Sequence, residues 1–149
     1  MINIQDTRLS IVVSEFNPII TDSLLDSAIE CFINSGGSKN NIDIFKVSGA
    51  FEIPGVVSQI LKKNKADLIV ALGCIIKGQT KHYDYIATET SRALMKMILN
   101  YDIPIGFGIL TTDDMKQALE RSKKNNSNKG REAMEAALGV LRIYNKIKG

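Results

Sequence analysis

The sequence of 149 residues contains no tryptophan, two cysteines and a single histidine. Any step that needs an imidazole therefore has one candidate, His82. Cys31 and Cys74 lie far apart in the chain, with no CxxC spacing, and one histidine cannot complete a zinc site with them. We therefore expect two reduced, buried thiols and no metal site.

Long apolar runs and a strong excess of one charge are also missing. No stretch of about 18 apolar residues is present, and the first ten residues are mixed polar rather than a basic and then apolar signal. These features predict a cytoplasmic protein without a membrane segment. The formal net charge of +3 is too small to indicate a nucleic-acid surface, although small anions remain suitable ligands.

The length and composition are those of an ordinary globular domain. Hydrophobic residues make up 44% of the chain and charged residues 23%, which excludes disordered, collagen-like and coiled-coil classes. No repeat is visible, and the polar stretch 122–130 is too short to divide domains. The sequence therefore predicts one domain over residues 1–149.

Four short apolar runs alternate with segments of helical period, a pattern typical of βαβ units. The expected strands are 10–13, 42–47, 68–72 and 104–110. The expected helices are centred on 20–32, 53–61, 82–101, 115–119 and 129–146. This order implies a three-layer α/β/α sandwich with a short parallel sheet and right-handed crossovers. Residues 1–9 are left over, and we expect them to form a further strand that pairs with a neighbouring subunit.

Ligands of open α/β sheets bind at the carboxyl ends of the strands, so functional residues are expected in the turns that follow. These turns are 14–17, 48–52, 73–82 and 110–112. The third turn brings Gly78, Thr80 and nearby lysines to the start of a helix, where backbone N–H groups favour a phosphate. It does not match the GxxxxGK[ST] phosphate loop, and an ordinary glycine-containing turn is the commoner explanation.

Taken one at a time, the candidate residues have ordinary explanations. A lone histidine such as His82 is more often a surface or capping residue than a proton carrier. An apolar Cys74 at a strand end more often packs than reacts. Phe16, in a polar turn, is a better candidate for stacking on a flat ring than Phe107, which lies inside a strand. A basic cluster either clamps a phosphate or is a solvated helix end, the commoner case. That cluster comprises Arg121, Lys123, Lys124 and Lys129.

Read together and in order, the turns form a specific pattern. The segments that carry it are Phe16-Asn17 with Ile20-Thr21, Gly49-Ala-Phe-Glu-Ile-Pro54, Ala71-Leu-Gly-Cys74, Lys77-Gly-Gln-Thr-Lys-His-Tyr-Asp-Tyr85, Phe107-Gly-Ile-Leu-Thr-Thr112 and Asn128-Lys-Gly130. From about Leu9 to the C-terminal helix, the chain resembles the 6,7-dimethyl-8-ribityllumazine synthase family. No single motif carries this resemblance, since it rests on their shared order and spacing.

The resemblance implies a flavodoxin-like subunit and a condensation reaction. The reaction joins 5-amino-6-(D-ribitylamino)uracil to 3,4-dihydroxy-2-butanone 4-phosphate and releases phosphate and water, with no metal or redox cofactor. It is the penultimate step of riboflavin biosynthesis, and the enzyme is a transferase. The resemblance further implies pentamers, which associate in some members into decamers or sixty-subunit icosahedral shells, and riboflavin synthase as a candidate partner.

The resemblance also assigns roles to residues. Phe16 would stack on the pyrimidine, and His82 would move protons. A neighbouring subunit would contribute Phe107. The pyrimidine and ribityl chain would be bound by Ala50, Phe51, Glu52, Cys74, Ile75 and Ile76, largely through backbone groups. The phosphate would be held by Gln79, Thr80 and Arg121, with Lys129 as a candidate support.

The chain departs from the family pattern at a few positions. Lys77 stands where an arginine is usual, Tyr83 where a phenylalanine is common, and 122–125 replaces a smaller, glycine-containing loop. The alternative class is a non-catalytic flavodoxin-like module, either a flavin-binding protein or a receiver domain. The turn after the first strand disfavours both, because Glu15 is its only acid and it lacks a Ser/Thr/Gly-rich phosphate loop.

Overall fold

A computed structural model describes residues 3–78 and 82–149 and shows one parallel sheet. Its strands are β1 (Leu9–Ser14), β2 (Ile42–Val47), β3 (Leu68–Ile76) and β4 (Ile105–Thr112). They lie in the order β2-β1-β3-β4, and each adjacent pair is parallel. This flavodoxin-like α/β arrangement confirms the fold class that the sequence predicts.

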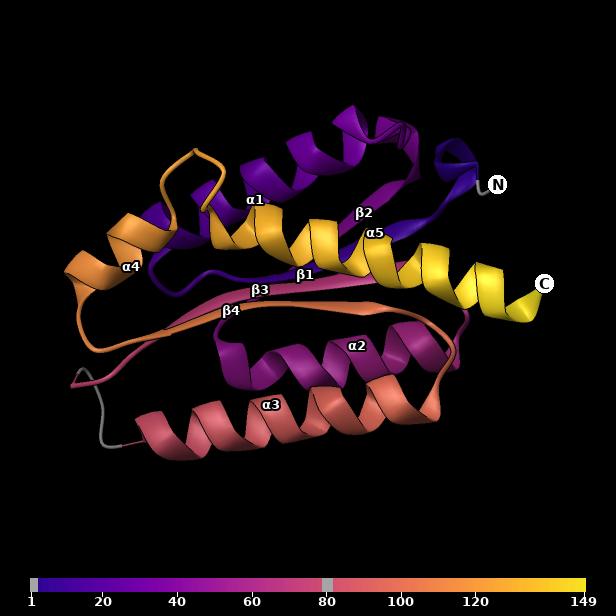
Figure 1. The fold of residues 1–149 in the computed structure, drawn as a ribbon. Helices are drawn as coiled ribbons and strands as arrows, with labels where there is room; N and C mark the ends of the chain where they lie inside the picture. Colours follow the sequence, from indigo (N-terminus) through magenta and orange to yellow (C-terminus); the bar gives the residue numbers. More distant parts are fainter. Residues whose placement is uncertain (1–2, 79–81) are drawn as a thin grey trace.

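Helices cover both faces of the sheet and complete the three layers (Figure 1). On one face lie α1 (Pro18–Asn34) and α5 (Lys129–Lys148), and on the other lie α2 (Ile53–Lys62) and α3 (Tyr83–Asn100). The short α4 (Met115–Arg121) follows β4. The 3-10 turns are η1 (Ile4–Asp6), η2 (Lys39–Asn41) and η3 (Ala50–Glu52). Both chain ends lie at the opposite end of the molecule from α4, which leaves the carboxyl ends of the strands clear of the termini.

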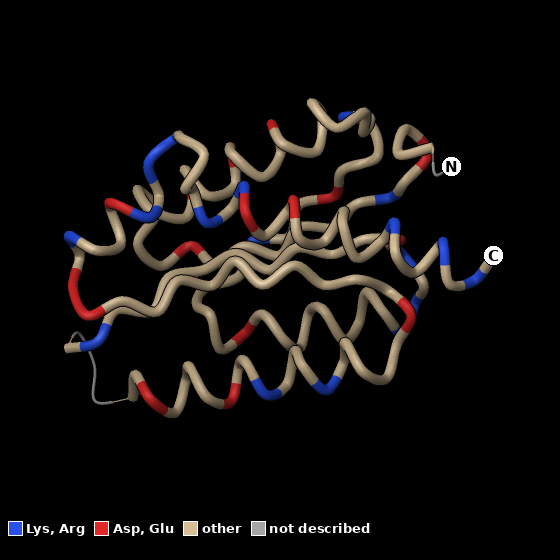
Figure 2. The backbone as a smooth tube through the Cα atoms, in the orientation of Figure 1, with Lys and Arg blue, Asp and Glu red and all other residues tan. Residues whose placement is uncertain are grey.

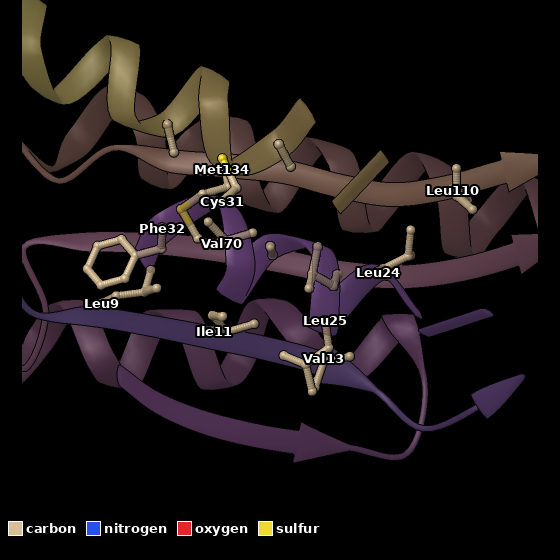
Figure 3. Close-up of a cluster of buried hydrophobic side chains, with 14 of the residues drawn as sticks. Leu9, Ile11, Val13, Leu24, Leu25, Cys31, Phe32, Val70, Leu110 and Met134 are labelled. Carbon is tan, nitrogen blue, oxygen red and sulfur yellow. The ribbon is translucent and has the colours of Figure 1, made fainter. Parts of the chain in front are cut away.

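The central strands are buried between two apolar layers. Every residue of β1 and β3 is buried, as expected for parallel strands covered on both faces. Alternate residues serve opposite layers, so Ile11 packs in the cluster with α1 and α5, whereas Val12 packs in the cluster with α2 and α3. Figure 3 shows the first cluster, in which Phe32 and Leu24 of α1 are among the labelled side chains that pack against the sheet. Each fully buried side chain of this size stabilises the fold by about 1.5–3 kcal/mol.

Charged residues lie mainly outside these apolar layers. In Figure 2 the positive and negative residues are interspersed along the helices and loops, while the strands are mostly tan. Among the described helices, none is long and apolar enough to cross a membrane. The modest net charge is therefore spread over the helical layers in small groups.

Strands β3 and β4 extend further than the sequence patterns predict. The sequence pattern places Cys74, Ile75 and Ile76 in the turn after the third strand, but they form the last residues of β3. The reason is continued pairing with β4, whose register runs to Ile76 and Thr112. The turn therefore begins at Lys77, whose N–H donates to the carbonyl of Thr112. The prediction that the third helix includes Tyr101 is also wrong by one residue, because α3 ends at Asn100.

Of the N-terminal segment, the described residues 3–8 form no strand within this chain. Ile4–Asp6 form η1, and Arg8 is held by a bidentate ion pair with Asp67 at the start of β3. Strand β2 is at the sheet edge, and its Ile44 and Phe45 are 43% and 39% exposed. An exposed edge of this kind is a template for another strand. Addition of the N-terminal segment to a neighbouring sheet stays a prediction.

Helices α1 and α5 approach each other closely at Gly130. A Cβ added there would overlap the carbonyl oxygen of Leu24 in α1, so the two helices would have to separate. Gly139, further along α5, has no atom within 4 Å of the position of an added Cβ. Gly130 and Gly139 are therefore a matched pair for alanine substitution, because both lie in α5 and only Gly130 is closely packed.

We predict that Gly130→Ala lowers the free energy of unfolding by about 1–3 kcal/mol through overpacking. Gly139→Ala should instead raise it by about 0.5–1 kcal/mol, because alanine favours the helix and meets no neighbour. Urea unfolding of both variants beside the parent protein measures the difference. Equal effects of the two substitutions would contradict the close packing of α1 on α5.

Candidate functional site

The sheet opens between β1 and β3 at its carboxyl end. The register of β1 with β3 ends at Val13 and Leu72, whereas β3 continues beside β4 to Ile76. Beyond Ser14, the chain turns toward β2, where the N–H groups of Glu15 and Phe16 donate to the carbonyls of Val47 and Ser48. The last residues of β3 therefore have no β-ladder partner on their β1 side, and their backbone groups are available to a ligand. This is the switch point at which ligands of such sheets bind.

A cavity of about 590 Å³ lies at this opening. Its lining residues are Phe16, Ser48, Gly49, Ala50, Phe51, Glu52, Cys74, Ile75, Ile76, His82, Tyr85 and Ile86. This first cavity brings together eight of the residues singled out from the sequence, although they come from three separate strand ends and the start of α3. Its volume is in the range of small-molecule sites.

Exposed aromatic rings border the first cavity. Phe16 is 57% exposed and Phe51 is 59% exposed, so neither ring serves mainly to fill the core. The backbone positions Phe16 through its hydrogen bond to Ser48, and Asn17 follows with a φ of 61° before α1 begins. Flat apolar rings held at a cavity entrance suit stacking on a planar heterocycle.

The turn after β2 places one carboxylate in the first cavity. Ala50–Glu52 form η3, and α2 starts directly after it with proline in its first turn. The hydroxyl of Ser48 donates to Glu52 Oε1 at 2.9 Å. This bond holds the carboxylate over the turn and leaves its other oxygen available to accept from a ligand.

Two buried polar atoms lie beside this opening. Ser14 Oγ and Asn17 Nδ2 have no hydrogen-bond partner among the residues that the structure describes. Buried polar groups are normally satisfied by protein, water or ligand. Ser14 ends β1 and Asn17 lies shortly after it, so the two side chains add polar character to a largely apolar region.

His82 stands at the N-cap position of α3. Its carbonyl accepts from the N–H of Ile86, and its ring lies 6.5 Å from that of Tyr85 between centroids, with the planes tilted by 44°. The side chain is exposed and lines the first cavity, where it can reach a bound molecule. Gln79 and Thr80, predicted to bind phosphate, lie outside the described residues.

Cys74 lines the first cavity, but its thiol is not suited to act as a nucleophile. Burial raises the pKa of Cys74 to about 11. A thiol must ionise to attack, so this shift keeps Cys74 protonated near neutral pH. Its role at the cavity is therefore one of packing and of presenting its backbone groups. Burial also raises the pKa of Cys31, which lies in the apolar cluster with α1 and α5.

The remaining predicted residues line a second cavity. This cavity, of about 390 Å³, is bordered by Phe107, Ile109, Leu110, Thr111, Arg121, Ser127, Lys129 and Glu132. None of these residues lines the first cavity. The second cavity lies at β4, the edge strand opposite β2, and is built with α4 and α5. Within one chain, Phe107, Arg121 and Lys129 are thus grouped together but apart from His82.

The second cavity combines two cations, Arg121 and Lys129, with one carboxylate, Glu132, and an apolar wall. Phe107 is 37% exposed even though it lies within β4. Among the described residues, the ion pairs are Arg8–Asp67, Lys123–Glu120, Lys124–Asp26 and Arg131–Glu135. They engage neither Arg121 nor Lys129, so both cations are available to an anionic ligand.

Sequence reasoning did not assign a role to several lining residues of the first cavity. Ser48 and Gly49 were placed in the turn after the second strand without a function, and Ser48 proves to hold Glu52. Tyr85 and Ile86 were missed as lining residues, although helical spacing from His82 puts them on the same side of α3. In the part of the chain that is described, no cluster of three or more His, Cys, Asp or Glu residues suits a metal ion.

The fold and the first cavity define a small-molecule-binding α/β protein of the flavodoxin-like class. A family model described as 6,7-dimethyl-8-ribityllumazine synthase matches residues 6–145. A protein of that name from Helicobacter pylori is 41% identical over 142 residues, which cover 95% of this chain and 91% of the relative. Another from Lawsonia intracellularis is 42% identical over 140 residues, 94% of this chain and 89% of the relative. A third, from Campylobacter fetus, is 39% identical over 143 residues, 96% of this chain and 92% of the relative.

The chain belongs to the 6,7-dimethyl-8-ribityllumazine synthase family. The resemblance stated from the sequence motifs, and the enzyme class that it implies, are confirmed by these comparisons.

Proposed function

We propose that this protein condenses 5-amino-6-(D-ribitylamino)uracil with 3,4-dihydroxy-2-butanone 4-phosphate to form 6,7-dimethyl-8-ribityllumazine. Family membership supports the reaction. The observation that carries the proposal at the level of residues is the first cavity, which gathers eight predicted site residues at the opening between β1 and β3.

The first cavity binds the pyrimidine and its ribityl chain in this proposal. Phe16 stacks on the planar ring, and Glu52 accepts hydrogen bonds from substrate N–H or O–H groups. Cys74 and Ile76 offer backbone groups that have no ladder partner on the β1 side, whereas the backbone groups of Ile75 point toward β4. A substrate rich in amide and hydroxyl groups suits such a backbone edge.

His82 carries the proton transfers. The substrate amine attacks the ketone carbonyl, and water leaves as the imine forms, which requires protons to move between nitrogen and oxygen. Phosphate elimination and ring closure require further transfers of the same kind. An imidazole suits both directions near neutral pH. Alignment of the two substrates supplies much of the remaining acceleration.

The phosphate of the second substrate is bound by Arg121, with Lys129 in support and with Gln79 and Thr80 from the turn before His82. Arg121 and Lys129 line the second cavity together and are engaged in none of the ion pairs formed by the described residues. A guanidinium is well matched to phosphate oxygens because it donates two parallel hydrogen bonds.

The complete active site is formed between two subunits. Phe107 and Arg121 line a cavity separate from the one that holds His82, yet the reaction needs both groups around one pair of substrates. Joining the first cavity of one subunit to the second cavity of its neighbour satisfies this requirement. Exposed aromatic rings at both cavities, Phe16, Phe51 and Phe107, support burial against another chain.

A head-to-tail contact of this kind closes into a ring, and we propose a pentamer. The N-terminal segment of one subunit then adds to the exposed edge of β2 in another, where Ile44 and Phe45 are available to be covered. Association of pentamers into decamers or sixty-subunit icosahedral shells, and contact with riboflavin synthase, are further proposals from the family resemblance. Native mass measurement distinguishes these assemblies.

Incubation of the purified protein with both substrates tests the reaction. We expect the lumazine chromophore to form well above the rate in a matched solution without protein. Formation at the uncatalysed rate by folded, assembled protein would overturn the proposed activity.

We predict that His82→Ala lowers kcat by about 10²-fold or more, because proton transfer by a positioned side chain contributes on that order. Assembly and the KM for the phosphorylated ketone should change little, since the ring is exposed at the start of α3. Steady-state kinetics and native mass are measured on the same preparation. An unchanged kcat would mean that His82 does not carry the proton transfers.

A complementation experiment tests the shared site. His82→Ala removes a residue of the first cavity, and Arg121→Ala removes one of the second. When the two variants are co-expressed at equal levels, about a quarter of the interfaces in random rings regain both side chains. Activity at low ketone concentration should therefore exceed that of either variant alone. Mixed rings with no such gain would contradict a site shared between subunits.

A further inference from the structure

Asn128, directly before α5, is a fully buried polar side chain, with 0% of its surface exposed. Its Nδ2 donates to the carbonyls of Ser122 and Lys123, at 2.9 and 3.0 Å. Its Oδ1 accepts from the N–H groups of Gly130 and Arg131, at 2.8 and 3.2 Å. Both donors and both acceptor sites of the amide are thus used.

These four bonds join the two segments that carry the cations of the second cavity. Ser122 directly follows Arg121 at the end of α4, and Gly130 directly follows Lys129 at the start of α5. Asn128 thus ties the chain just after Arg121 to the helix turn that contains Lys129. The hydroxyl of Ser23 in α1 also donates to the carbonyl of Ser122, which anchors the same point to a third helix.

Helix α4 needs such an anchor. It has only seven residues, too few for an isolated helix to be stable, and Ala118 is its only buried residue. The direction of Arg121 at its last position therefore depends on what holds Ser122. The side chain of Arg121 is exposed and lines the second cavity beside Lys129.

We propose that Asn128 is a positioning residue for phosphate recognition, which holds Arg121 and Lys129 in a fixed relation across the second cavity. It touches no substrate and acts through the backbone at Ser122 and Gly130. The inference rests on the proposed function, in which Arg121 binds the phosphate of the ketone substrate.

The substitution Asn128→Asp keeps the hydrogen bonds of this side chain to α5 and removes those to the end of α4. Aspartate still accepts from the N–H groups of Gly130 and Arg131 and caps α5 well. It has no N–H for the carbonyls of Ser122 and Lys123, so the connection to α4 is lost. We expect the KM for the phosphorylated ketone to rise about tenfold, with kcat and the KM for the pyrimidine within about twofold of the parent values.

The matched control is Asn126→Asp, which places the same charge in the same loop. Asn126 is exposed, and its side chain makes no hydrogen bond to a described residue. Its substitution should leave both KM values unchanged. Hydrogen exchange provides a readout independent of activity: amides over 122–128 should exchange faster in Asn128→Asp than in the control.

Ser23→Ala gives a milder second variant in case Asn128→Asp does not fold. It removes the bond from α1 to the carbonyl of Ser122 and should raise the ketone KM in the same direction by a smaller factor. A ketone KM that stays unchanged in both folded variants would overturn the inference. An equal rise of both substrate KM values would overturn it as well, since it would indicate a general structural role.

The Arg121→Ala variant distinguishes two failures: that of the positioning role of Asn128 and that of the proposed phosphate binding by Arg121. If Arg121→Ala raises the ketone KM while Asn128→Asp does not, the phosphate assignment stands and the positioning role is wrong. If Arg121→Ala leaves the ketone KM unchanged, the phosphate assignment fails and the positioning role fails with it.

Discussion

The parting of β1 from β3 is the constraint on which the site depends. Both strands are buried between helical layers, and they pair with each other up to Val13 and Leu72. Beyond Ser14 the chain turns toward β2, while β3 continues along β4. The buried lengths of strand make the frame rigid, and the divergence leaves backbone groups of Cys74 and Ile76 at an open edge. A cavity therefore forms where the sheet ends, without distortion of the core.

In the proposed reaction, this frame allows a small number of catalytic side chains to suffice. The first cavity is lined mainly by apolar residues and backbone, with Glu52, His82 and Tyr85 as its ionisable groups besides the protonated Cys74 thiol. The second cavity supplies Arg121 and Lys129 on a different edge of the molecule. The proposed reaction needs groups from both cavities, and neither cavity of one subunit holds all of them. The reaction therefore requires assembly of subunits.

Much of the fold follows from local pattern. The apolar run 42–47 coincides with β2, and the helical period around Leu24 and Phe32 coincides with α1. Asp114 and Asn128 cap α4 and α5 with their side chains, as short polar residues do at helix starts. The misplaced strand end at Cys74–Ile76 has a different origin. Glycine at position 73 suggested a turn, but pairing with β4 carries the strand onward, and such pairing is set by residues far away in the sequence.

The order of motifs along the chain, from Phe16-Asn17 to Asn128-Lys-Gly130, was enough to determine the family, the fold class and the candidate residues. Only the tertiary structure decided how those residues are grouped: His82 with Phe16 and Glu52 in one cavity, Arg121 with Phe107 and Lys129 in another. The same is true of Asn128, whose part in the sequence motif says nothing of its bonds to Ser122 and Lys123. The physical reason is that sequence records neighbours along the chain, whereas cavities and buried hydrogen bonds join segments that meet only when the sheet and its helices pack.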